Sequence, residues 1–95
     1  MRPVHPGEVL RDELETIGLS ANALSKALGV PVNRITAILN RQRGITADTA
    51  LRLARYFGTT PQLWLNLQQA YELRRAETAV GRLIAERVQP RHTAA

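Results

Sequence analysis

LSANALSKALGVPVNRITAILN, residues 19–40, decides the fold because it predicts two short helices that cannot merge into one. Gly29 supplies the left-handed position that ends the first helix, and Pro31 disfavours the helical conformation at Val30. Two helices joined by so short a turn cross at a steep angle. This is the arrangement of a helix-turn-helix unit, whose second helix can enter the major groove of DNA.

The inside of this unit is specified by apolar residues at helical spacing. Ser25 lies where the two backbones come closest, and its small side chain suits such a crossing. Its hydroxyl can bond back to the carbonyl one turn earlier. The side chains that we expect to close the unit are Leu24, Leu28, Val30, Ile35, Ile38 and Leu39.

The other side of the second helix carries short and mostly polar side chains. At about 100° per residue, a buried stripe centred on Ile35 turns these residues away from the core. They are Asn33, Thr36, Ala37 and Asn40, with Val32 and Arg34 on the flanks. Asn can pair with adenine, Thr can bond a base edge, and Val or Ala can touch a thymine methyl group. The alternative is an ordinary solvated face.

The distribution of charge favours DNA over a solvated face. Six Lys and Arg residues stand against Asp48 alone between residues 16 and 58, so this segment holds the whole net charge of +5. A surface that faces phosphates requires such a concentration. Arg41 and Arg43 follow the second helix and can bind the phosphates beside the groove. For Arg52 and Arg55, which we expect to project outward, a solvated surface is the favoured interpretation.

Composition narrows the class of protein. Ninety-five residues, 44% of them hydrophobic, make one domain with a small core. No apolar run reaches the roughly 18 residues of a membrane span, and the N-terminus does not resemble a signal peptide. The chain has no cysteine, and its two histidines lie in the terminal segments. We therefore expect a cytoplasmic protein with no catalytic site, no metal and no cofactor.

Three further helices frame the unit, which predicts an all-α fold of five helices. The first begins near Pro6 and ends at Gly18, and another runs from the cap Thr46 to Gly58. Their expected buried residues are Val9, Leu10, Leu14 and Ile17 in the first, and Ala50, Leu51, Ala54 and Phe57 in the other.

The last helix begins at Thr60 and Pro61 and has more apolar surface than one core needs. Its residues Leu63, Trp64, Leu67 and Tyr71 are expected either in the core alone or in the core and a dimer interface. From Glu77 the pattern weakens, so AVGRLIAERV either continues this helix or forms another that breaks at Gly81. QPRHTAA is expected to be a disordered tail.

An acidic face on the first helix has three interpretations. Glu8, Asp12 and Glu15 share one side, together with Glu13. A solvated face is favoured, since acids near a helix N-terminus are stabilising. Docking of a basic partner protein comes second and a metal site third.

Two stretches carry a family resemblance, RPVHPGEVLRDEL and LSANALSKALGVPVNRITAILNRQRGITADTALRLARYFGTTPQLWLNLQQAYELR. They closely resemble the HigA-type antitoxins of bacterial toxin–antitoxin (addiction) modules, a branch of the Xre/Cro, lambda-repressor-like helix-turn-helix class. The resemblance covers about residues 2–75. It implies a helix-turn-helix domain over residues 1–75, with residues 76–95 as a helical extension and flexible tail.

The resemblance also implies partners and DNA-binding residues. The partners are double-stranded operator DNA, a second copy of the chain, and a HigB/RelE-like mRNA endonuclease toxin whose docking site we place at Glu8, Asp12 and Glu15. In the wider class the first residue of the second helix is commonly a glutamine that contacts DNA, whereas here it is Ala21, and whether Asn22 takes over stays open. The DNA-binding candidates are Ala21, Asn22, Val32, Asn33, Arg34, Thr36, Ala37, Asn40, Arg41 and Arg43.

Two rival functions stay open at this point. A repressor without a toxin would have the same sequence features, and the neighbouring gene would separate the two. A protein-binding adaptor would use the same helix as an interface, and DNA binding at two salt concentrations would exclude it.

Overall fold

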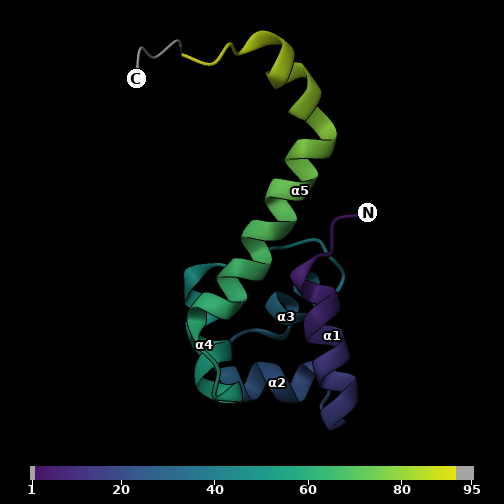
Figure 1. Ribbon diagram of the computed structural model, residues 1–95. Coiled ribbons are helices and arrows are strands. Elements are labelled where there is room, and N and C mark those ends of the chain that lie inside the picture. Colours follow the sequence, from purple (N-terminus) through teal and green to yellow (C-terminus); the bar gives the residue numbers. More distant parts are fainter. Residues whose placement is uncertain (1, 92–95) are drawn as a thin grey trace.

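The computed structural model describes residues 2–91, and within that range the chain forms five α-helices and no strand (Figure 1). The helices are α1 (Pro6–Ile17), α2 (Ala21–Leu28), α3 (Val32–Leu39), α4 (Ala47–Phe57) and α5 (Pro61–Arg87). In Figure 1 the first four helices form a body, while α5 begins on this body and then projects away from it. The all-α prediction is confirmed.

The helix ends lie where the sequence predicts them. Gly18, Gly29 and Gly58 end α1, α2 and α4 in the left-handed conformation. At the other ends, the hydroxyl groups of Ser20, Thr46 and Thr60 accept hydrogen bonds from backbone N–H groups of α2, α4 and α5. These caps satisfy groups that a helix leaves unpaired at its ends, so they fix the length of each helix.

One core joins all five helices. The side chains buried there are Leu10, Leu14, Leu24, Leu28, Ile35, Ile38, Ile45, Ala50, Leu53, Ala54 and Trp64. Ser25 of α2 is buried, and its hydroxyl donates to the carbonyl of Asn22 at 2.7 Å. Val30 and Leu39 are partly buried against the same core. The helix-turn-helix unit is therefore closed by the side chains that its spacing predicts.

Two predicted core residues are exposed. Leu51 is 60% exposed, and Leu53 is fully buried instead. Leu51 lies about 100° around the helix from Ala50, whereas Leu53 lies between the buried Thr49 and Ala50. Ile17, the last residue of α1, is also half exposed. The prediction was wrong for Leu51 because it admitted too wide an arc, and for Ile17 because the direction is right but the residue lies at the end of α1.

The helix α5 continues through Gly81 to Arg87 without a break. The prediction that AVGRLIAERV continues the helix is confirmed, and the alternative of a separate helix that breaks at Gly81 is wrong. No helix among residues 2–91 is both long and apolar enough to cross a membrane. Of the predicted disordered tail, residues 92–95 lie outside the described residues.

Candidate nucleic-acid interface

The outward side of α3 carries the side chains that rotation about its axis predicts. Ile35 and Ile38 are fully buried, so the opposite side of this eight-residue helix faces solvent. We call the set of side chains on that side the recognition face: Val32, Asn33, Thr36, Ala37 and Asn40. Thr36 and Ala37 are half-buried, and the other three are exposed. All five side chains are short, so a large partner could approach the backbone of α3 closely.

The start of α2 offers one polar side chain. Ala21 is half-buried against the core, and Asn22 is exposed. Ser20, which precedes them, uses its hydroxyl to accept from the Ala23 N–H at 3.1 Å. Of the two candidates at this helix start, only Asn22 can offer a side-chain hydrogen bond to a ligand.

Asp48 pairs with two of the six basic residues of the middle segment. One carboxylate oxygen, Oδ1, accepts from Arg34 Nη1 at 2.7 Å and from Arg52 Nε at 2.8 Å. The hydrogen bonds from Arg52 and Arg34 lower the pKa of Asp48. Arg34 is therefore drawn toward α4 in this structure, and the outward positive charge is smaller than the sequence indicates.

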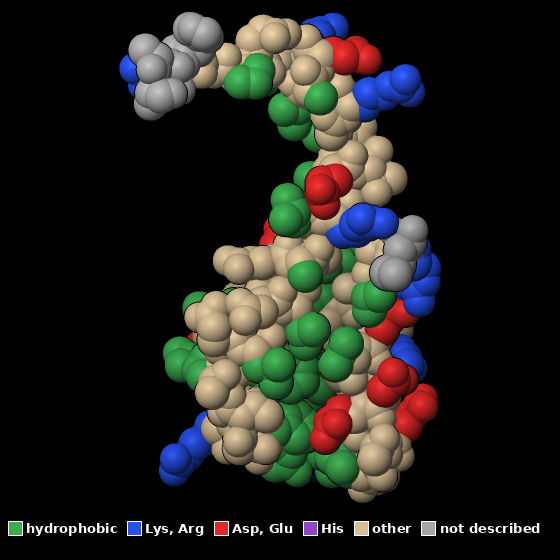
Figure 2. Space-filling model, in the orientation of Figure 1, with side chains coloured by type: hydrophobic (Ala, Val, Ile, Leu, Met, Phe, Trp, Pro, Cys, Tyr) green, Lys and Arg blue, Asp and Glu red, His purple; other side chains and the backbone are tan. Residues whose placement is uncertain are grey.

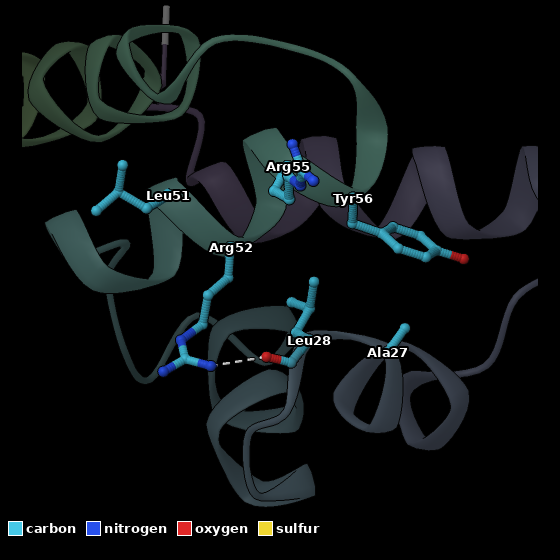
Figure 3. A pocket seen from close by; sticks show the side chains of 6 residues that line it. All are labelled: Ala27, Leu28, Leu51, Arg52, Arg55 and Tyr56. Atoms are coloured by element: carbon cyan, nitrogen blue, oxygen red, sulfur yellow. Dashed lines mark hydrogen bonds between the residues drawn. The ribbon is translucent and has the colours of Figure 1, made fainter.

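Arg52 has a structural task that the sequence did not reveal. Its Nη1 donates to the carbonyl of Leu28 at 2.8 Å, which joins α4 to the last turn of α2 (Figure 3). A cation at this position also compensates the negative end of the α2 dipole. An open groove lies between these two helices, and its lining consists of Ala27, Leu28, Leu51, Arg52, Arg55 and Tyr56. The expectation that Arg52 is merely a solvated surface residue was wrong.

The loop after α3 is held by hydrogen bonds at both ends. Arg41 has a φ of 62°, and its N–H donates to the Ile38 carbonyl at 3.0 Å. The N–H of Gln42 donates to the Ala37 carbonyl at 2.8 Å. Arg41 and Arg43 are both exposed. The two arginines therefore project from a backbone of fixed shape.

Gln68 of α5 holds the other end of this loop. Its Oε1 accepts from the buried Ile45 N–H at 2.7 Å. Gly44 leaves room for the amide, because a Cβ atom there would lie within 2.8 Å of several Gln68 side-chain atoms. The sequence analysis missed Gln68, since a contact across 23 residues leaves no local pattern.

His5 is the second residue that the sequence analysis missed. It is only 3% exposed, and its Nδ1 accepts from the Gly7 N–H at 2.9 Å, which caps α1. Its ring packs edge-on against Tyr71 of α5, with centroids 4.7 Å apart. Burial lowers the pKa of His5, and the charge of Arg41 lowers it further. Proline at the first helical position and Glu8 at the third were the available signal, since the proline favours a helix start and the glutamate supplies half of a capping box.

The acidic face of α1 is divided by the structure. Glu8 binds Arg2 through both carboxylate oxygens, at 2.7 and 2.9 Å, and also accepts from the His5 N–H. These hydrogen bonds lower the pKa of Glu8 to about 2. Asp12 and Glu15 are exposed, and Figure 2 shows acidic side chains gathered along the outer side of α1. Glu8 is thus committed to folding, whereas Asp12 and Glu15 remain available to a partner.

Comparison with known proteins identifies the family. A helix-turn-helix family model (HTH_3) matches residues 10–64. The virulence-associated protein I of Dichelobacter nodosus is 62% identical over 78 residues, which cover 81% of this chain and 72% of that protein. An addiction module antidote protein of the HigA family from Coxiella burnetii has a TM-score of 0.94 at 56% identity, over 96% of this chain and 100% of that chain. This chain belongs to the helix-turn-helix family, in its group of HigA-type antitoxins.

A further HigA-type structure includes DNA. The Pseudomonas aeruginosa antitoxin HigA with the higBA promoter is 48% identical to this chain, with a TM-score of 0.91 over 94% of this chain and 98% of that one.

Residues in the stretches that carry the HigA-type resemblance have identifiable structural roles. In HPGE, His5 and Glu8 form the capping box of α1. Gly7 has no room for a Cβ atom, because the Ile38 carbonyl of α3 lies against it. In the RGIT segment, Gly44 and Ile45 make the contact with Gln68. These motifs therefore fix the position of α3 and of the loop that follows it.

Proposed function

We propose that this chain is an antitoxin that binds operator DNA as a dimer, represses the operon it shares with a toxin, and neutralises that toxin, a RelE-like mRNA endonuclease. DNA binding rests on one observation, the exposed recognition face of α3 with Arg41 and Arg43 at its C-terminal end. Neither arginine forms an ion pair with Asp or Glu among residues 2–91. The P. aeruginosa antitoxin HigA with its promoter supports the proposal.

The residues divide into base contacts and phosphate contacts. Asn33 and Thr36 would bond base edges, and Val32 or Ala37 would touch a thymine methyl group. Phosphate contacts would come from Asn40, Arg41 and Arg43, joined by Asn22 at the start of α2. Arg34 would reach DNA only by leaving Asp48. In a dimer the two recognition faces would enter major grooves about 34 Å apart.

A gel shift with the chain's own promoter and with random DNA, each at two salt concentrations, tests DNA binding. Asn33→Ala should cost about 1–3 kcal/mol on the operator and relax its sequence preference, because one base contact is lost. Arg43→Ala should weaken all DNAs alike and flatten the salt slope by about one. Equal losses on operator and random DNA for Asn33→Ala would remove the base-contact assignment.

The dimer interface that we propose lies on α5. Trp64 is 3% exposed, and its Nε1 donates to Thr59 Oγ1. It therefore belongs to the core of its own chain, and its prediction as an interface residue is wrong. Leu63 is exposed, and Leu67 and Tyr71 are half-buried. Beyond them α5 exposes further apolar side chains at helical spacing: Leu73, Val80, Leu83, Ile84 and Val88 at its end. An apolar stripe of this length favours pairing with a second α5.

Toxin neutralisation would use the free part of the acidic face. Asp12 and Glu15 fit a basic nuclease by charge. Co-expression with the neighbouring gene product, followed by co-purification, tests the partnership. Asp12→Lys with Glu15→Lys should reduce toxin retention while operator binding survives, and Glu86→Lys on α5 is the matched control. Full toxin retention by the double variant would exclude this face.

A further inference from the structure

Within residues 2–91, four helices are followed by a residue in the left-handed conformation, and one of these four residues is not glycine. Gly18, Gly29 and Gly58 have φ angles of 68°, 70° and 71°, while Arg41 after α3 has 62°. The turn after α3 is closed by the hydrogen bonds of a Schellman motif, which glycine makes without steric cost. Arginine is strained in this conformation. A strained residue in a stable turn points to a function of its side chain.

The side chain of Arg41 borders a pocket that collects arginines from three separate parts of the chain. Arg2 precedes α1, Arg41 follows α3, and Arg75 lies on α5. The pocket has a volume of about 330 Å³, and its lining consists of Arg2, Pro3, His5, Glu8, Arg41, Tyr71 and Arg75. Three guanidinium groups therefore meet a single carboxylate at this pocket.

The partners of these groups leave two of the arginines available. Arg2 is held by Glu8 at 2.7 Å. Arg75 contacts only Tyr71, whose hydroxyl accepts from Nη1 at 3.3 Å and whose ring centroid lies 6.0 Å from the guanidinium carbon. Arg41 makes no side-chain hydrogen bond or ion pair among residues 2–91, although its charge helps to lower the pKa of Glu8. His5 is buried beside them and uses Nδ1 as an acceptor, so it is uncharged. The pocket thus keeps an excess of positive charge in a shape set by the core.

We propose that Arg41 and Arg75, with Arg2 behind them, bind a backbone phosphate of the operator beyond the C-terminal end of α3. This inference rests on the DNA binding proposed above and extends the contact surface to α5 and the N-terminal segment. The pocket borders Arg41, which directly follows Asn40 of the recognition face, and planar guanidinium groups match phosphate geometry. The arginine at the left-handed position is kept for this contact in place of the glycine that the turn would prefer.

Two substitutions separate this role from folding. Arg41→Gly relieves the strain, so the melting temperature should stay equal or rise, while the slope of log K against log salt should fall. Arg75→Gln should lower the slope too. The two substitutions together should lower it by about 0.9, the value of the one phosphate contact that both arginines share. Arg55→Gln, which removes an exposed arginine of α4 that does not line this pocket, is the matched control and should leave the slope unchanged.

Single methylphosphonate substitutions along the operator identify the phosphate. One position should weaken binding of the wild-type chain and weaken binding of Arg75→Gln distinctly less, because that variant has already lost one of its contacts to this phosphate. Inorganic phosphate alone should not displace the operator at concentrations of equal ionic strength to chloride; selective displacement would make the pocket a site for free phosphate and overturn the proposal. An unchanged slope for Arg75→Gln, with wild-type binding intact, overturns it too and leaves the proposed function standing. Failure of the wild-type chain to bind its promoter at low salt would instead overturn the proposed function.

Discussion

The two halves of α5 have the same secondary structure and different surroundings. From Pro61 to Tyr71 the helix packs on the body, where Trp64 enters the core and Gln68 holds the loop after α3. From residue 72 to Arg87 every residue is exposed except Gly81, which is half-buried. The hydrogen bonds of the helix are the same along its length, so they do not explain why it has these two parts. The near half is stabilised by its own chain, and the far half exposes the apolar side chains that the proposed dimer would cover.

Trp64→Ala is the strongest test of the near half. Removing this buried side chain should lower the free energy of unfolding by about 3–5 kcal/mol. Urea denaturation followed by circular dichroism measures the loss. A cost below about 1 kcal/mol would mean that the near half is not part of the core.

Gln68→Ala tests whether α5 positions the loop that carries Arg41 and Arg43. The buried Ile45 N–H would lose its acceptor, which should cost about 1–3 kcal/mol of stability. Operator affinity should fall even at temperatures where the variant is fully folded, because the loop loses its fixed shape. Gln69→Ala on the exposed side of the same turn is the control, and similar losses for both variants would contradict this role.

The burial of His5 beside the near half of α5 gives the fold a pH dependence. Because the pKa of His5 is lowered in the folded state, the unfolded chain binds a proton more readily as the pH falls below about 6.5. Stability should therefore be complete above this pH and decrease from there toward the pKa of the folded state. Thermal melts between pH 5 and 7.5 measure it.

His5→Asn is the matched variant for that pH series. Asparagine keeps a side-chain acceptor for the cap of α1 and has no titrating group. The decrease in stability between pH 6.5 and 5 should be smaller in this variant. An identical pH profile in both proteins would assign the effect to other groups.

Leu83→Asp with Ile84→Asp is the opposite test, in the far half. At concentrations where the wild-type chain is monomeric, the free energy of unfolding should change by no more than about 0.5 kcal/mol. Sedimentation at higher concentration should show that the variant no longer dimerises. A dimer that survives both substitutions would exclude the far half as the interface.

Local signals predicted most of the fold. The caps and glycine ends follow from residue types that act within one helical turn, so the positions of α1 to α4 were predictable. The outward set Asn33, Thr36 and Ala37 was also predictable, because Ile35 and Ile38 leave one orientation for a short helix.

Contacts between distant segments were not predictable in the same way. The burial of His5 depends on Tyr71, and the pairing of Asp48 with Arg34 crosses two helices. Leu51 and Leu53 are the same residue type on one helix, and only the packing of α4 on the body decides between them. These side-chain choices depend on tertiary geometry that helical periodicity does not contain.

The unbroken course of α5 has a consequence for the spacing of binding sites on DNA. If two such helices pair, sliding one past the other by a single turn moves the bodies by about 5.4 Å, roughly one and a half base-pair steps. The distance between half-sites would then depend on the alignment of the two rods, remote from any side chain that meets a base. Insertion or deletion of one turn near Gly81 would change which operator lengths are accepted while leaving the preferred bases unaltered.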